Sequence, residues 1–246
     1  MEILGIDVGG TGIKGVPVNL KSEDYLGERF RLPTPIPRKP KEMIKTIGEV
    51  VKHWDWKGPV GVGFPTVVHK GKALQYGNLD PDWKGLQIDK MIEDHIGLPV
   101  AVINDADAAG LAEVTFGVGR NEKGLVMVFT VGTGIGSGVF YDGKLIPNFE
   151  LGQLRYKKKK TIEQYASRAV RLNNDMSFKK WGKRFNKFIQ LVTTISDPDL
   201  IIIGGGASKN LDEYRHKLKT DVPILAAHTK NHAGIIGAAL AAKHLL

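Results

Sequence analysis

One short pattern occurs twice in this chain of 246 residues: an apolar strand runs into a glycine turn, which leads into a second strand. The first copy covers residues 5–11 and the second covers residues 129–134. A third glycine turn, at 204–206, follows another apolar run. Glycine permits the backbone conformations and the close approaches that such turns need. The repetition predicts two similar lobes that face a cleft.

Strand-like and helix-like segments alternate between these turns, which predicts an α/β fold with sheets covered by helices. Short β-branched runs bounded by Pro or Gly are typical of buried strands. The expected strands are 2–8, 12–18, 60–64, 100–103, 124–131, 135–141 and 200–203, and the expected helices are 41–53, 105–114 and 233–246. We expect one lobe at 1–103, with the C-terminal helix 232–246 packing back onto it, and a second lobe at 104–231.

Composition excludes several classes of protein. The chain has no cysteine, which removes disulfide scaffolds, thiolate metal sites and cysteine nucleophiles together, so no zinc is expected. No apolar run approaches the roughly 20 residues that a membrane-spanning helix needs. The first residues read as a strand rather than a signal peptide, because a basic start and a cleavage site are missing. We therefore expect a cytoplasmic protein with no membrane partner.

The charge of the chain is concentrated in one segment. Residues 153–187 hold twelve Lys and Arg against two Asp and Glu, a net charge of +10, whereas the whole chain carries +9. Such a segment attracts polyanions, although a solvated helical face that only aids solubility is the alternative. The basic residues are Arg155, Lys157, Lys158, Lys159, Lys160, Arg168, Arg171, Lys179, Lys180, Lys183, Arg184 and Lys187.

The first glycine turn carries groups suited to phosphate. Gly9 and Gly10 would let backbone N–H groups approach phosphate oxygens, and Thr11 and Lys14 would add side-chain donors. Asp7, at the strand end, could position a hydrated Mg²⁺. A plain β-hairpin with a glycine turn is the alternative interpretation.

The second turn, at 130–138, has four glycines and three hydroxyl side chains, with Thr133 and Gly134 near its tip. It is neither a Rossmann fingerprint, which opens a helix, nor a Walker A loop, which needs Gly-Lys-Ser/Thr. Together with the third turn, in which Gly205 lies, it favours a phosphate-handling cleft.

Asn104 and Asp105 end a predicted buried strand, where α/β proteins commonly place functional groups. A carboxylate there can accept a hydroxyl proton while the adjacent amide orients the substrate. The alternative is a helix N-cap, and the two roles are compatible. Glu150 and Glu163 could accept paired hydrogen bonds from a polyol, although a surface position is the simpler interpretation of each.

Four motifs resemble, in order and spacing, those of the ROK family of sugar kinases: Asp7…Gly9-Gly10-Thr11…Lys14, Asn104-Asp105, the turn at 130–137, and Ile202-Ile203-Gly204-Gly205-Gly206. The resemblance extends from Met1 to the last helix. It implies the two-lobed, actin-like ATPase fold of hexokinase type (ribonuclease H-like), with a central cleft. A homodimer and Mg²⁺ accompanying the phosphoryl donor are also implied.

Within that family the chain is similar to the bacterial polyphosphate glucokinases in its short length and in its loops at 78–85 and 147–152. This implies transfer of a terminal phosphoryl group from polyphosphate, or from ATP, to the 6-hydroxyl of glucose or a similar hexose. Arg155 and residues 157–160, Lys157 and Lys158 among them, would guide the polyphosphate, and the same hypothesis extends to Lys179, Lys180, Lys183 and Arg184.

The resemblance also assigns roles to individual residues. Asp105 would be the base that deprotonates the sugar hydroxyl. Gln153 replaces the family's usual histidine, which puts the sugar preference in question. The remaining sugar-side residues would be Asn104, Glu150, Glu163, Gly63, Pro65 and Thr66, and the phosphate-side residues would be Asp7, Gly10, Thr11, Lys14, Thr133 and Gly134.

Two other functions stay open. One is an ATP-dependent ROK hexokinase acting on glucose, mannose or a related sugar, with the basic segment as a solvated face. The other is a non-catalytic protein that binds polyanions, which predicts no turnover. No nucleic-acid partner is expected from the spread-out tryptophans, because they form no visible stacking platform.

Overall fold

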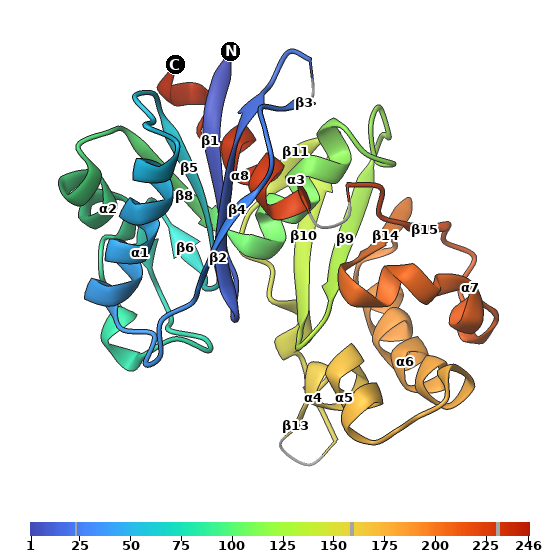
Figure 1. Ribbon diagram of the computed structural model, residues 1–246. Helices are drawn as coiled ribbons and strands as arrows, with labels where there is room; N and C mark the ends of the chain where they lie inside the picture. The colour runs from blue at the N-terminus through green and yellow to red at the C-terminus, as the bar shows by residue number, and fades with distance from the viewer. Residues whose placement is uncertain (23, 158–159, 230–231) are drawn as a thin grey trace. The chain divides into compact units, whose positions relative to one another are not determined.

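The computed structural model describes residues 1–22, 24–157, 160–229 and 232–246, and its backbone forms two compact units (Figure 1). Unit 1 comprises Met1–Ala112 and His232–Leu246, and unit 2 comprises Glu113–Asn231. The division falls inside helix α3 (Asp105–Thr115), whereas the sequence suggested a division before Asn104. The first turns of α3 pack on the C-terminal helix of unit 1, where a Cβ added at Gly237 would collide with the backbone of Ala108.

The main sheet of unit 1 joins three parallel strands to an antiparallel edge. The order is β3-β2-β1-β5-β8, with β4 also paired to β2, and β1, β5 and β8 run parallel. A separate two-stranded sheet pairs β6 with β7. The strands are β1 (Glu2–Val8), β2 (Gly12–Asn19), β3 (Asp24–Tyr25), β4 (Phe30–Pro33), β5 (Val60–Phe64), β6 (Val68–His69), β7 (Lys72–Ala73) and β8 (Val100–Asn104).

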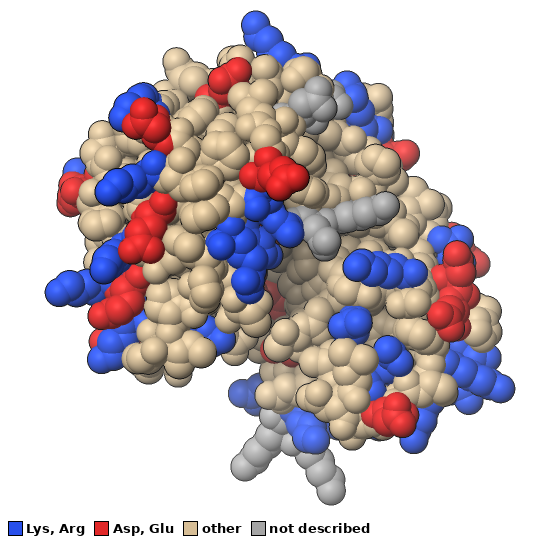
Figure 2. Space-filling model, in the orientation of Figure 1, with Lys and Arg blue, Asp and Glu red and all other residues tan. Residues whose placement is uncertain are grey.

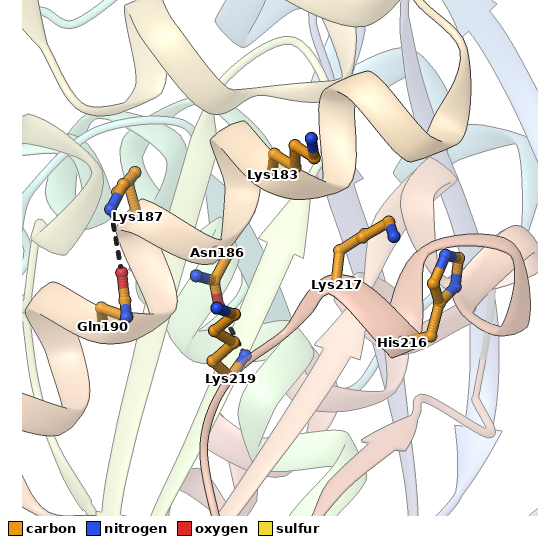
Figure 3. Close-up of a pocket in the computed structure, with 7 residues that line it drawn as sticks. All are labelled: Lys183, Asn186, Lys187, Gln190, His216, Lys217 and Lys219. Carbon is orange, nitrogen blue, oxygen red and sulfur yellow. Dashed lines mark hydrogen bonds between the residues drawn. The ribbon is translucent and has the colours of Figure 1, made fainter.

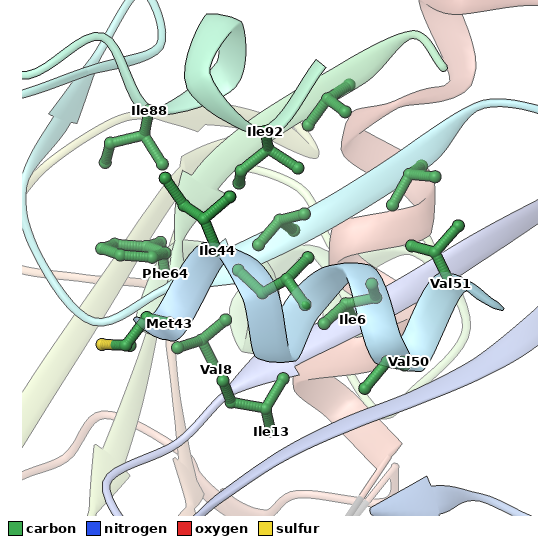
Figure 4. Packing of buried hydrophobic residues seen from close by; sticks show 14 of the residues in the cluster. Ile6, Val8, Ile13, Met43, Ile44, Val50, Val51, Phe64, Ile88 and Ile92 are labelled. Carbon is green, nitrogen blue, oxygen red and sulfur yellow. The ribbon is translucent and has the colours of Figure 1, made fainter. Parts of the chain in front are cut away.

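Alternate side chains of β1 face opposite helical layers, as the two-residue period of a strand requires. Ile6 and Val8 join the core beneath α1 (Pro40–His53) and α2 (Ile88–Ile96) (Figure 4). Ile3 instead packs with Ile235 of α8 (Ala233–Ala241). The α1 face is built at helical spacing from Met43, Ile44, Ile47, Val50 and Val51, all buried.

Helix α8 lies unusually close to the sheet, because glycines face it. A Cβ at Gly5 would collide with the Ile235 carbonyl, and one at Gly61 would collide with the Ala238 carbonyl. The predicted final helix is therefore observed in unit 1, although it ends at Ala241 and a 3₁₀ turn follows at Lys243–Leu245.

Unit 2 repeats the arrangement with a five-stranded sheet in the order β11-β10-β9-β14-β15. Strands β9 and β10 are the predicted antiparallel pair, and β14 lies parallel to β9. The strands are β9 (Leu125–Val131), β10 (Ile135–Tyr141), β11 (Lys144–Ile146), β14 (Leu200–Gly204) and β15 (Ile224–Ala226), and β12 (Arg155–Tyr156) pairs separately with β13 (Lys160–Thr161).

The longest helix of the described chain, α6 (Phe178–Ser196), begins in the basic segment, and no helix was predicted for these residues from the sequence. Its buried face, with Trp181, Phe185 and Phe188, packs on the β9–β14 core, and its opposite face carries the lysines. The short helices α4 (Glu163–Ala166), α5 (Arg168–Asn173) and α7 (Leu211–Tyr214) complete this unit. No helix among the described residues is long and apolar enough to cross a bilayer.

Candidate active site

The parallel strands of unit 1 bring three predicted site positions to one sheet edge. In the strand register Asp7 is paired with Gly63, and Phe64 is paired with Asn104. The carboxyl ends of parallel strands are where α/β proteins place functional groups. Asp7, Gly63 and Asn104 therefore lie at the same edge of the sheet.

The first glycine turn is held by side chains that the sequence analysis did not select. The Thr34 hydroxyl donates to the Gly9 carbonyl at 2.6 Å, and Arg38 Nη2 donates to the Gly10 carbonyl at 3.0 Å. Arg31 Nη2 donates to the Thr11 carbonyl at 2.6 Å. These bonds fix the turn from the carbonyl side. Only the strand β4 pattern and the loop after it could have signalled these residues, because all three lie there.

Lys14 and Asp7 form an ion pair across β1 and β2, with Lys14 Nζ 3.3 Å from Asp7 Oδ2. The side chain of Lys14 is 24% exposed and that of Asp7 is 20% exposed. The pair lies directly beside the turn, since Lys14 follows Gly12 in β2. A cation and a carboxylate are thus available next to backbone groups that the turn leaves exposed.

Asn104 is the N-cap of α3 and is only 5% exposed. Its Oδ1 accepts from the backbone N–H groups of Ala106 and Asp107 at 2.9 and 3.0 Å, and its Nδ2 donates to the Thr66 carbonyl at 3.0 Å. The capping interpretation is therefore confirmed for Asn104. Asp105, half-buried, begins the helix on this anchored backbone.

The Pro65–Thr66 segment is tied to the same edge. Thr66 is 5% exposed, and its hydroxyl donates to the Gln75 carbonyl at 2.7 Å while Asn104 binds its carbonyl. Pro65 is partly exposed. The predicted sugar-side residues of unit 1 are thus brought together around the start of α3.

In unit 2 the second glycine turn is closed by a glutamate. The Glu163 carboxylate accepts from the Ile135 backbone N–H at 3.1 Å, and a Cβ added at Gly134 would collide with its Oε2. Gly132 N donates to the Gly134 carbonyl at 3.0 Å, which makes the turn tight and leaves Thr133 exposed at its tip. Glu163 is consequently partly buried and bound to the second glycine turn.

Gln153 completes this group. Its Nε2 donates to Glu163 Oε1 at 2.7 Å, so both oxygens of that carboxylate are engaged. Burial raises the pKa of the nearby Glu150 carboxyl above its ordinary 4.5, and the charge of Glu163 raises it further. Two carboxylates and an amide that lie in one neighbourhood can accept and donate several hydrogen bonds to a polyol.

The third glycine turn lies against the second. Gly205 has a φ of +68°, and a Cβ there would come within 2.9 Å of the Val131 backbone. Only glycine fits both conditions without strain. The Arg168 side chain lies over the adjacent Gly206, so a fixed cation accompanies this turn. Sequence analysis counted Arg168 only as part of the basic segment.

Lys157 lies at the tip side of the β12–β13 hairpin, and its Nζ is 5.5 Å from the Tyr156 ring centre and 5.1 Å from that of Tyr165. The guanidinium carbon of Arg184 also lies over the Tyr165 ring, 4.8 Å from its centre. Lys158 and its neighbour Lys159 lie outside the described residues. On the face that Figure 2 shows, Lys and Arg side chains are spread over both units.

Among the described residues, no cluster of three or more His, Asp or Glu side chains could hold a metal unaided. Asp7 alone presents a partly exposed carboxylate at a strand end beside the turn. A divalent cation can be bound by one or two carboxylates together with phosphate oxygens and water, so a single Asp fits such an ion.

Comparison with known proteins connects these residues to a family. The model of the ROK family matches residues 3–148. A polyphosphate glucokinase of Mycobacterium tuberculosis (strain CDC 1551 / Oshkosh) is 43% identical over 238 residues, which cover 96% of this chain and 89% of the relative. A polyphosphate glucokinase of Mycobacterium leprae is 41% identical over 96% of this chain and 73% of its own length.

The comparison with solved structures agrees with this family match. The inorganic polyphosphate/ATP-glucomannokinase of Arthrobacter sp. strain KM has a TM-score of 0.94 and 41% identity, covering 100% of this chain and 99% of its own. A ROK family glucokinase of Streptomyces griseus, solved with glucose and AMPPNP, has a TM-score of 0.84 and 25% identity, covering 99% and 100%. These matches confirm the actin-like ATPase fold that the motifs implied. The chain is a member of the ROK family.

Proposed function

We propose that this chain is a glucokinase that transfers the terminal phosphoryl group of inorganic polyphosphate, or of ATP, to the 6-hydroxyl of glucose. The observation that carries the proposal is the 43% identity, over 96% of the chain, to a protein named polyphosphate glucokinase. The match to a polyphosphate/ATP-glucomannokinase supports the same donors and adds mannose as a second acceptor.

Asp105 is the proposed base. It would take the proton of the sugar hydroxyl while that oxygen forms a bond to the terminal phosphorus and the phosphorus–oxygen bond to the rest of the donor breaks. The shortened polyphosphate, or ADP, leaves with the electron pair of that bond. The Asn104 cap, held by the Thr66 carbonyl, fixes the backbone from which this carboxylate projects. Such positioning is a large part of catalysis in phosphoryl transfer.

The sugar would be oriented by hydrogen bonds to its hydroxyl groups. Glu163, Glu150 and Gln153 of unit 2 would form hydrogen bonds with hydroxyl groups of the sugar. The 63–66 segment of unit 1 would also line the sugar pocket. The Gln153–Glu163 hydrogen bond supports this role, because it fixes the amide and the carboxylate in one orientation before the sugar arrives.

The phosphoryl donor would be held by the glycine turns. Thr11 and Lys14 in unit 1 and Thr133, Gly134 and Gly205 in unit 2 supply side-chain and backbone donors for phosphate oxygens. Lys157 and Lys158 would extend this cradle toward a polyphosphate chain. When bound, Mg²⁺ would neutralise charge on the transferring phosphoryl group. Asp7 would bind this ion directly or accept a hydrogen bond from one of its water ligands.

A coupled assay for glucose 6-phosphate tests the proposal. Purified protein is given glucose, Mg²⁺ and either long-chain polyphosphate or ATP, with mannose as a second acceptor. We expect turnover with polyphosphate and a loss of about 10²- to 10⁴-fold in kcat for Asp105→Asn. Unchanged thermal unfolding of that variant shows that the loss is chemical. Turnover with ATP alone would favour the ATP-dependent hexokinase, and no turnover with any sugar would favour the polyanion-binding protein.

The family relationship also leads us to propose a homodimer in the cytoplasm. Light scattering during size-exclusion chromatography would test the dimer, since a mass of one chain, 26.9 kDa, contradicts it.

A further inference from the structure

Unit 2 contains a pocket whose lining residues lie outside the glycine turns and carboxylates described above, although Lys183 is among the lysines that the sequence links to polyphosphate. The pocket has a volume of about 470 Å³ and lies between α6 and the segment 216–219. Figure 3 shows it with Lys183 and Lys187 on the helix and Lys217 on the facing segment. His216 and Lys219 complete the cationic or titratable lining. Every lining residue belongs to unit 2, so the pocket forms within one unit.

Local packing fixes both walls of this pocket. Gly182 lets α6 approach the facing segment, because a Cβ there would come within 2.9 Å of the Tyr214 Cβ and 3.2 Å of the Lys217 Cβ. The Asn186 side chain, 6% exposed, accepts from the Lys219 backbone N–H at 2.6 Å. The two walls are therefore held at a set separation by buried contacts, and the lysine side chains project from rigid backbone.

The lining of the pocket carries positive charges that no acidic lining residue offsets. No Asp or Glu lines the pocket, although Asp212 and Glu213 lie a few residues before the facing segment. In the part of the chain that the structure describes, none of the four lining lysines forms an ion pair, and Lys187 Nζ only contacts Gln190 Oε1 at 3.3 Å. Like charges gathered around one cavity repel one another until an anion enters. A solvated helical face alone would not need a second, facing wall of lysines.

We propose that this pocket binds a stretch of a linear inorganic polyphosphate chain, away from the place of phosphoryl transfer. Lysine ammonium groups act as point charges that suit a flexible chain of phosphates, which offers no fixed bidentate geometry. Stacking of nucleobases has little support here, since His216 is the only ring in the lining. The inference rests on the proposed function and deepens it: the pocket retains long donors by a second contact, which raises the effective concentration of the chain's other end.

The test compares two pairs of substitutions. Lys187→Gln with Lys219→Gln removes one exposed charge from each wall, and Lys123→Gln with Lys144→Gln removes two exposed charges elsewhere in unit 2. Long-chain polyphosphate binding is measured without sugar by displacement of a fluorescent polyphosphate, and KM is measured for long-chain polyphosphate and for tripolyphosphate.

We expect the pocket pair to weaken long-chain binding and to raise its KM by about five- to tenfold, as the loss of two partly screened charge contacts implies. The KM for tripolyphosphate, kcat and the control pair should stay at wild-type values. Lys187→Glu, which reverses one charge, should lower long-chain binding further. Equal losses in both pairs, or no loss in the pocket pair, would overturn the proposal.

Two further arms separate this proposal from the proposed function. Asp105→Asn should bind long-chain polyphosphate as wild type does while its kcat for glucose 6-phosphate formation falls by about 10²- to 10⁴-fold. A wild-type protein without polyphosphate turnover contradicts the proposed function, whereas the binding comparison alone decides on the pocket. Single-stranded RNA of equal charge that binds as tightly, with the same loss in the pocket pair, would overturn the assignment to polyphosphate.

Discussion

Glu113 connects the two places where the chain passes between the units. It is the first residue of unit 2, is fully buried, and binds the segment just before the chain returns to unit 1 at His232. Its Oε1 accepts from the Thr229 N–H at 2.7 Å and from the Thr229 hydroxyl at 2.5 Å. Its Oε2 accepts from the backbone N–H groups of Val118 and His228 at 3.2 and 3.1 Å.

The substitution Glu113→Gln keeps the shape of this side chain and removes one acceptor oxygen. Each oxygen of Glu113 accepts two hydrogen bonds, so the new amide NH₂ group faces two donors in either orientation. The orientation of lowest energy points the NH₂ group at Thr229, because the Thr229 hydroxyl can rotate and accept a hydrogen bond from it. At least one buried N–H still loses its partner, and the remaining hydrogen bonds lose their charge. We expect the free energy of unfolding to fall by about 3 kcal/mol, because one N–H loses its hydrogen-bond acceptor and the remaining pair of hydrogen bonds is weakened.

Urea unfolding followed by circular dichroism measures this loss, with Glu122→Gln as the control because Glu122 is exposed. The control should stay within about 0.5 kcal/mol of wild type. Hydrogen exchange adds a local readout: the amides of His228 and Thr229 should exchange faster in Glu113→Gln. A variant within about 0.5 kcal/mol of wild type, with unchanged exchange at these amides, would refute the hydrogen-bond argument.

Three further predictions follow from other parts of the molecule. Because burial raises the pKa of the Glu150 carboxyl, the folded state holds this proton more tightly than the unfolded state does. The stability gained in this way is lost as the pH rises above about 4.5. Glu150→Gln should flatten that decline when thermal unfolding is measured against pH. Gly61→Ala should destabilise the protein by about 2–4 kcal/mol in urea, since its Cβ would collide with the Ala238 carbonyl, whereas Gly63→Ala on the same strand meets only ordinary contacts and should cost less than about 1 kcal/mol; similar losses would contradict the packing argument. Gln153→His should raise the ratio of kcat/KM for glucose over mannose, and an unchanged ratio would show that this position does not select the sugar.

The sequence was a good guide wherever local pattern alone decides structure. The strands at 2–8, 60–64 and 135–141 were predicted with the observed bounds, because short β-branched runs between glycines have few alternatives. The glycine turns and the polar strand end at Asn104 were equally visible. Each of these features is a property of fewer than ten consecutive residues.

The tertiary structure decided which of those residues meet. Nothing local says that Glu163 closes the turn at Gly134, or that Gln153 binds the same carboxylate, because these contacts depend on how separate segments pack. The same holds for Asn186, which looks like an ordinary polar residue of a basic segment until it is seen to anchor Lys219. Long-range contacts of this kind are set by the packing of the hydrophobic cores. The sequence by itself thus determined the strands, the turns and the chemistry of the site residues, and only the packed chain determined their partners.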